Sequence, residues 1–161
     1  WPDLVLLTGD TPTANTQSEW LQGVLKNKLG LNIKIDKQIF KQRLAKMTSG
    51  DFDLVMAGWG PDYDDPLTFG DLFASWNLNN RGRYASSEMD KAIEIAQSAR
   101  EPKRRMEAFN IIQNTIFEDV VILPMYERGS TYVIHPQLKN VKKRALGAST
   151  DYTKAYVATP G

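Results

Sequence analysis

Apolar and polar positions in the first part of the chain follow two periods, one typical of strands and one typical of helices. Residues 4–7 form a short apolar run, which predicts a buried strand. Apolar side chains recur every three or four positions over residues 12–29, which predicts an amphipathic helix with Thr11 as its cap and Gly30 as its left-handed end. Residues 31–36 then alternate between apolar and polar, so we expect a second strand.

The same alternation of element types continues through the next stretch. A second helix is expected over residues 38–49, with Gly50 as its end, and a third strand over residues 52–58. Short links between successive strands and helices are typical of parallel crossovers. We therefore predict an α/β fold, in which helices flank a largely parallel sheet.

Past residue 66 the pattern predicts mainly helices. Ser86 or Ser87 can cap one helix, and Pro102 suits the first turn of the next. The other expected elements are a short helix within 67–76, a loop at 77–84, and a strand at 120–126 broken by Pro124. Residues 131–134 and 141–144 are expected to be weaker strands or extended returns of the chain. The pattern predicts no element for residues 148–161.

The length and composition fit one folded domain. The chain has 161 residues, of which 42% are hydrophobic and 24% charged, which is ordinary globular usage. We interpret residues 1–161 as a single α/β lobe. Because the sequence opens with Trp1 and Pro2 rather than with a methionine, we expect it to be an excised part of a longer protein.

Charge and residue usage exclude several classes of function. Lys and Arg number 20 against 19 Asp and Glu, so no general field attracts nucleic acid, and the basic run 139–144 is interpreted as a solvated edge without function. The chain has no cysteine and one histidine, His135, so we expect no metal site and no cofactor. No membrane-length apolar run and no signal peptide are seen.

The stretch 57–69 is the candidate site. It follows the third expected strand, and its glycines and prolines prevent a regular element from continuing. Trp59 and Asp62 therefore lie just beyond a strand end. In open α/β sheets, ligands are usually held in the crevice beyond the carboxyl ends of the strands.

Three carboxylates, Asp62, Asp64 and Asp65, are close together in this stretch. A calcium loop would need a Gly and a distal Glu that are missing here, and a hydrolase using Asp62 and Asp64 would need a defined separation that adjacency does not supply. An acidic turn is the simplest interpretation. However, the indole of Trp59 beside a carboxylate favours recognition of an organic ammonium group.

Residues 58–66, followed by Phe69 and preceded by residues 50–54, resemble the peptide- and nickel-binding class (family 5) of extracellular solute-binding proteins of ABC importers. Residues 84–91 resemble a helix start of that family, and residues 122–126 resemble its late strand. The resemblance extends from Leu4 to Arg144. It implies a type II periplasmic-binding-protein fold, of which this chain matches the carboxyl-terminal lobe.

The resemblance also implies roles for four residues. In the oligopeptide-binding branch, the carboxylate that corresponds to Asp62 binds the α-ammonium group of the peptide. Trp59 would line the pocket, the main chain near Gly60 would meet the peptide backbone, and Tyr63 belongs to the same ligand-binding motif. No residue is expected to be catalytic.

By resemblance, we expect the protein to be the extracytoplasmic substrate-binding component of an ABC transporter, in the periplasm or as a cell-surface lipoprotein that faces outward. Its expected partners are a peptide ligand, the N-terminal lobe of the same protein and the membrane permease, without nucleic acid, and we expect a monomer. One alternative is a carrier for a metal chelate or another small solute on the same scaffold. The alternative from another class is the carboxylate-dependent hydrolase.

Overall fold

The computed structural model describes residues 2–144, 146 and 149–159. The chain divides into two compact units. The first unit contains residues 1–59 and 75–84, and the second contains residues 60–74 and 85–161.

A parallel sheet forms the centre of the first unit. Strand β1 (Leu4–Gly9) pairs in parallel with β2 (Ile33–Gln38) along its whole length and with β3 (Leu54–Val55), in the order β2-β1-β3. This confirms the predicted parallel crossovers. The third strand is shorter than the expected range 52–58. On either side of β3, single hydrogen bonds continue the pairing with β1, from Asp53 N–H to the Val5 carbonyl and from Met56 N–H to the Leu7 carbonyl.

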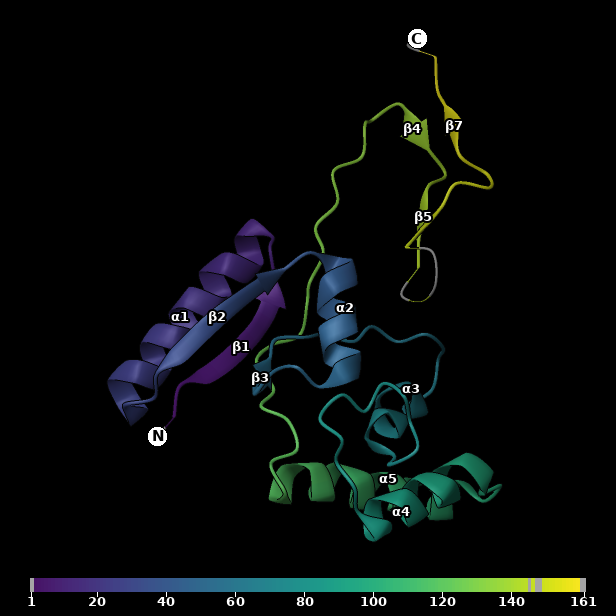
Figure 1. Cartoon of the computed structure of the whole chain (residues 1–161). Coiled ribbons are helices and arrows are strands. Elements are labelled where there is room, and N and C mark those ends of the chain that lie inside the picture. Colours follow the sequence, from purple (N-terminus) through teal and green to yellow (C-terminus); the bar gives the residue numbers. More distant parts are fainter. Residues whose placement is uncertain (1, 145, 147–148, 160–161) are drawn as a thin grey trace. The chain divides into compact units, whose positions relative to one another are not determined.

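Two helices accompany this sheet, as Figure 1 shows for α1 (Pro12–Leu29) and α2 (Phe40–Ser49). The Thr11 side chain accepts a hydrogen bond from Ala14 N–H, and Gly30 and Gly50 end the helices with φ of 69° and 79°, as the sequence predicts. Neighbouring strand residues Leu6 and Leu7 point to opposite faces, and both are buried. Both faces of β1 are therefore covered.

The segment 75–84 closes the first unit through polar contacts with the end of α2. Arg83 donates to the Ser49 carbonyl at 2.7 Å, and Arg81 donates to the Thr48 hydroxyl at 2.8 Å. The Asn80 side chain donates a hydrogen bond to the Tyr84 carbonyl and accepts one from the Tyr84 N–H. The predicted loop at 77–84 is therefore an ordered turn region.

The second unit is built on a helical pair. Helix α4 (Ser87–Ser98) and helix α5 (Pro102–Glu118) pack together, and the Ser86 hydroxyl caps α4 (Figure 1). Their shared core contains Met89, Ala92, Ile93, Ala96, Ala108 and Ile112. The short helix α3 (Leu67–Gly70) and the 3-10 turn η1 (Asp71–Phe73) pack against this pair, and both lie within the expected helical range 67–76.

Short antiparallel ladders end the described chain. Strand β4 (Leu138–Lys139) pairs with β7 (Tyr156–Val157), and β5 (Lys142–Lys143) pairs with β6 (Thr150–Asp151). The prediction of no element at 148–161 was wrong for β6 and β7, while residues 148, 160 and 161 lie outside the described residues. The strand predicted at 120–126 is absent from the described structure, because this segment has no ladder partner in it. Residues 131–134, expected as a weak strand or an extended return, form no strand there either.

Among the described helices, none combines the length and the apolar character that crossing a lipid bilayer requires.

Candidate functional site

The stretch 60–66 leads into α3 and is shaped by hydrogen bonds within the second unit. The Asp62 N–H donates to the hydroxyl of Thr68 at 3.0 Å, and Thr68 is buried. The Asp65 N–H donates to the Tyr63 carbonyl at 2.9 Å. The Asp65 carboxylate accepts from Leu67 N–H at 2.9 Å, the bond of an Asx turn just before α3. The backbone on both sides of Tyr63 is thus fixed.

The three acidic residues of this stretch have different surroundings. Asp62 and Asp64 are exposed, and neither carboxylate takes part in the ion pairs found among the described residues. Asp65 is half-buried and bound to Arg105. The acidic cluster of the sequence therefore separates into accessible carboxylates and one structural carboxylate.

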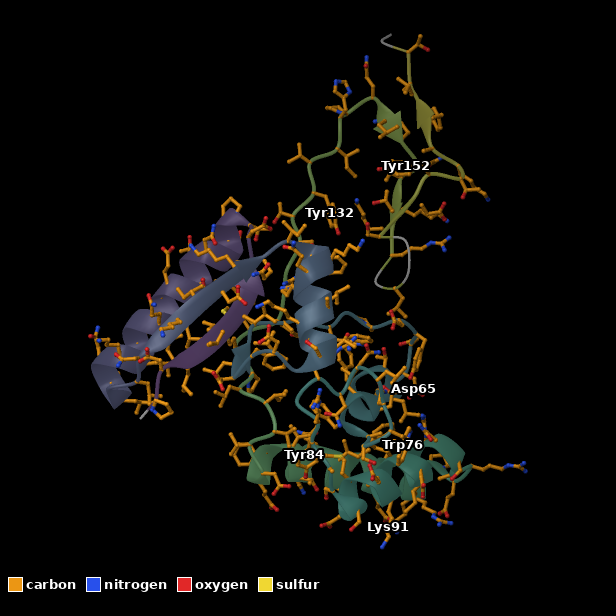
Figure 2. All side chains as sticks on the ribbon, viewed as in Figure 1. Asp65, Trp76, Tyr84, Lys91, Tyr132 and Tyr152 are labelled. Carbon is orange, nitrogen blue, oxygen red and sulfur yellow. The ribbon has the colours of Figure 1, made fainter. Side chains whose placement is uncertain are left out.

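The ion pair of Asp65 connects the loop to α5. The Nη2 atom of Arg105 lies 2.7 Å from each carboxylate oxygen of Asp65, which is labelled in Figure 2. The Leu67 N–H and, after it, the Arg105 guanidinium hold the pKa of Asp65 below its usual value. Asp65 is therefore a permanent anion at neutral pH whose charge is already compensated.

Tyr63 is 45% exposed, and its hydroxyl donates to the carboxylate of Asp71. Burial and, to a smaller extent, the charge of Asp62 raise the pKa of Asp71, although the hydrogen bond from Tyr63 opposes this. Burial and the nearby Asp71 charge raise the pKa of Tyr63. The carboxylates of Asp62 and Asp71 thus place negative charge around Tyr63.

The remaining two candidate residues lie next to each other in sequence but in different units. Trp59 ends the first segment of the first unit and is 41% exposed. Gly60 opens the second unit, and a Cβ placed there would meet no heavy atom within 4 Å. The backbone at Gly60 is therefore open, which is compatible with the main-chain contact expected there. The structure brings Asp62 and Tyr63 together within one unit.

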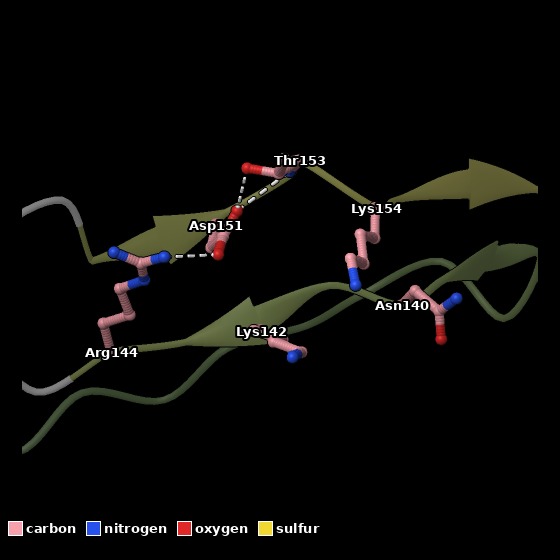
Figure 3. A pocket seen from close by; sticks show the side chains of 6 residues that line it. All are labelled: Asn140, Lys142, Arg144, Asp151, Thr153 and Lys154. Atoms are coloured by element: carbon pink, nitrogen blue, oxygen red, sulfur yellow. Dashed lines mark hydrogen bonds and ion pairs between the residues drawn. The ribbon is translucent and has the colours of Figure 1, made fainter.

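One pocket, of about 180 Å³, lies in the C-terminal ladders and involves none of the four candidate residues (Figure 3). Its lining residues are Asn140, Lys142, Arg144, Asp151, Thr153 and Lys154. The Arg144 guanidinium binds the Asp151 carboxylate, which also accepts hydrogen bonds from Thr153. This pocket coincides with the basic run 139–144, and we assign it no ligand.

Sequence reasoning did not identify Thr68, Asp71 and Arg105 as contributors to the candidate site. Arg105 lies forty positions from Asp65, and no local pattern relates them. Thr68 could have been noticed as a polar residue within an apolar helical turn. Among the described residues, no group of three or more His, Cys, Asp or Glu side chains is arranged to hold a metal ion.

Comparison with protein families matches residues 2–81 to the bacterial extracellular solute-binding proteins, family 5 Middle. A dipeptide-binding protein of Lactococcus lactis is 28% identical over 153 residues, which cover 92% of this chain and 28% of the relative. The periplasmic murein peptide-binding protein MppA of Escherichia coli is 30% identical over 114 residues, which cover 71% of this chain and 21% of the relative.

Solved structures show the same relationship at the level of the fold. The substrate-binding domain of an oligopeptide ABC transporter from Bacillus anthracis superposes with a TM-score of 0.86 at 30% identity, covering 98% of this chain and 31% of that chain. Listeria monocytogenes OppA bound to peptide superposes with a TM-score of 0.84 at 33% identity, covering 99% of this chain and 30% of that chain.

These matches define the class: the fold is that of type II periplasmic binding proteins, which confirms the predicted fold class. The chain belongs to the family 5 extracellular solute-binding proteins, as the motif at residues 58–66 indicated. The chain spans only 20 to 28% of the length of the first curated relatives. The family and the structural neighbours are binding proteins rather than enzymes.

Proposed function

We propose that this chain is one lobe of a longer extracytoplasmic binding protein, which captures peptides by their α-ammonium group and delivers them to an ABC permease. The relatives named for dipeptide, oligopeptide and murein peptide binding support this ligand class. The observation that carries the proposal is the state of Asp62: its backbone is fixed by Thr68, while its carboxylate is exposed and forms no ion pair among the described residues.

The chemistry of this arrangement suits an ammonium ligand. A carboxylate bound to a charged donor forms a stronger hydrogen bond than a neutral pair does. Every peptide with a free amino terminus carries that donor, so recognition does not depend on side-chain identity. Tyr63 and the open backbone at Gly60 would contact the adjoining peptide unit, and Trp59 would supply an apolar wall.

In this proposal, the full-length protein binds and releases its ligand without changing it chemically. It faces outward, either in the periplasm or as a cell-surface lipoprotein, and functions as a monomer with the permease as its membrane partner. Its N-terminal lobe closes over the ligand in a hinge motion. The identity of the bound solute then depends on both lobes, and this lobe contributes the ammonium site.

Isothermal titration calorimetry of the full-length protein tests this proposal. A tripeptide with a free amino terminus is compared with the same tripeptide acetylated at that terminus. The dissociation constant of the acetylated peptide divided by that of the free peptide is called the acetylation ratio. We expect the free peptide to bind at least tenfold more tightly. Equal binding of both peptides, or binding of neither, would reject the proposed ammonium site.

Chromatography of the bound peptide after long incubation separates the proposal from the hydrolase alternative. We expect the tripeptide to be recovered intact. Cleavage that is lost in the variant Asp62→Asn would instead identify an enzyme, since a binding protein has no reason to turn the ligand over.

A further inference from the structure

Arg105 occupies a fixed position that does not depend on Asp65. Its Nε atom donates to the carbonyl of Ala96 on α4 at 2.8 Å, and its guanidinium carbon lies 5.1 Å from the centre of the Phe109 ring. These contacts come from both members of the helical pair. The guanidinium is therefore held in place by α4 and α5 and can serve as an anchor for the loop that it binds.

The loop is attached to this anchor by a short chain of contacts. Arg105 binds both carboxylate oxygens of Asp65 at 2.7 Å, and the side chains are only 30% and 27% exposed. Asp65 in turn accepts from Leu67 N–H through its carboxylate and from Thr68 N–H at 3.1 Å through its carbonyl. Thr68 then holds the Asp62 N–H at 3.0 Å. The position of Asp62 thus depends on Asp65.

The same pair also removes one of the three carboxylates of the loop from competition for a cationic ligand. Asp65 lies three positions from Asp62 and would compete for an ammonium group if its charge were free. Bound to Arg105, it is already compensated. Asp62 and Asp64 are left as accessible carboxylates, and of these two Asp62 is the one whose backbone N–H is held by Thr68.

We propose that Arg105 is a positioning residue for the ammonium site, which acts through Asp65 and Thr68 to hold Asp62 where it discriminates a free amino terminus from a blocked one. This inference rests on the proposed function. It predicts a readout that general destabilisation would not change, namely the acetylation ratio, because the folded fraction affects both peptides equally.

The full-length protein is tested as wild type and as the variants Arg105→Gln, Arg105→Lys and Asp65→Asn. The matched control is Arg104→Gln, because Arg104 is exposed on the same helix and forms none of the ion pairs among the described residues. Calorimetry gives the acetylation ratio of each protein, and thermal unfolding gives its folded state. If Arg105→Gln does not fold, Asp65→Asn tests the same connection, since its amide oxygen can still accept the Leu67 N–H.

We expect Arg105→Gln to reduce the acetylation ratio by about tenfold and Arg105→Lys by less, with Arg104→Gln unchanged. Combining Arg105→Gln with Asp65→Asn should add little, because both remove one connection. An unchanged ratio in folded Arg105→Gln would overturn the inference while leaving the proposed function intact. Tighter binding of the free peptide by Arg105→Gln would also overturn it, because it would show that Arg105 acts only through its charge. A wild-type ratio near one would instead reject the proposed function.

Discussion

The Nζ atom of Lys46 lies 2.6 Å from a carboxylate oxygen of Asp36, so that an ion pair joins α2 to β2 within the first unit. Lys46 also binds Asp51 at 3.0 Å, just past the end of the helix. One ammonium group therefore connects the helix, the sheet edge and the turn that leads into β3. The order of the sheet and its covering helix is supported here by charge as well as by apolar burial.

The variant Lys46→Met is expected to lower the free energy of unfolding at pH 7, since it leaves Asp36 without its cation. The hydrogen bond from Lys46, and then that from Gln38, lower the pKa of Asp36. A carboxylate with a lowered pKa stabilises the fold above its ordinary pKa near 3.8, and this contribution is lost as the pH falls through the lowered value. The difference in the free energy of unfolding between the wild type and Lys46→Met should therefore become smaller below about pH 4.

Urea unfolding between pH 3 and pH 7 measures this dependence. Lys41→Met is the control, because Lys41 is exposed on the same helix and forms none of the ion pairs among the described residues. A deficit of Lys46→Met that stays the same down to pH 3 would show that the ion pair does not stabilise the fold.

Gly30 and Gly50 both end helices in the left-handed conformation, but they have different surroundings. A Cβ at Gly30 would meet nothing within 4 Å, whereas a Cβ at Gly50 would lie 2.9 Å from the Nη2 atom of Arg83. That atom donates to the Ser49 carbonyl. We expect Gly30→Ala to lower the free energy of unfolding by about 1 kcal/mol and Gly50→Ala by about 2 kcal/mol, because only the second displaces this hydrogen bond.

Chemical unfolding of both variants checks the difference. Repeating the comparison in an Arg83→Ala background should make the two glycine substitutions nearly equal, since the displaced group is then absent. If the two substitutions already have equal effects with Arg83 present, its side chain moves aside without loss, and the expected coupling does not exist.

Asp71 gives the protein an opposite pH dependence. Burial raises the pKa of Asp71, so the folded state retains its proton at a higher pH than the unfolded chain does. The stabilisation by this proton is present at low pH and is lost as the pH rises through the raised pKa. Compared with Asp71→Asn, the wild type should therefore become relatively less stable as the pH rises from about 4 through the raised pKa of Asp71.

Urea titrations of the wild type and Asp71→Asn at several pH values measure this difference. A stability difference that does not change with pH would mean that the carboxylate ionises normally in the folded protein. Tyr63→Phe supplies a second check: it removes the hydrogen bond that favours the ionised form, so it should make the decline of stability with pH steeper.

Sequence patterns predicted the parallel core and the helix ends because these depend on local chemistry. The caps at Thr11 and Ser86 and the left-handed glycines at 30 and 50 are properties of single positions. The prediction of a strand at 120–126 was wrong because a strand depends on a partner elsewhere in the chain. A strand exists only with a ladder partner, and neither periodicity nor propensity reveals one.

The candidate site was predicted only in part, because local sequence patterns do not reveal contacts between residues that are far apart in the chain. The motif at residues 58–66 identified the family and the candidates Trp59, Gly60, Asp62 and Tyr63. It could not separate Asp62 from Asp65, because the difference between them depends on Arg105, forty positions from Asp65 along the chain. Such contacts follow from the packing of α4 and α5, which the apolar pattern of each helix does not specify.

The most direct test of the account is a calorimetric comparison of Asp62→Asn with Asp64→Asn in the full-length protein. Asp64 is the matched control, since it is also an exposed carboxylate and lies two positions away. We predict that Asp62→Asn weakens binding of the free tripeptide by about 1.5–3 kcal/mol, the range for a charged hydrogen bond, and leaves the acetylated tripeptide unaffected. Asp64→Asn should change neither. If Asp62→Asn binds the free tripeptide as tightly as the wild type, or weakens both peptides equally, Asp62 does not recognise the ammonium group and the account is contradicted.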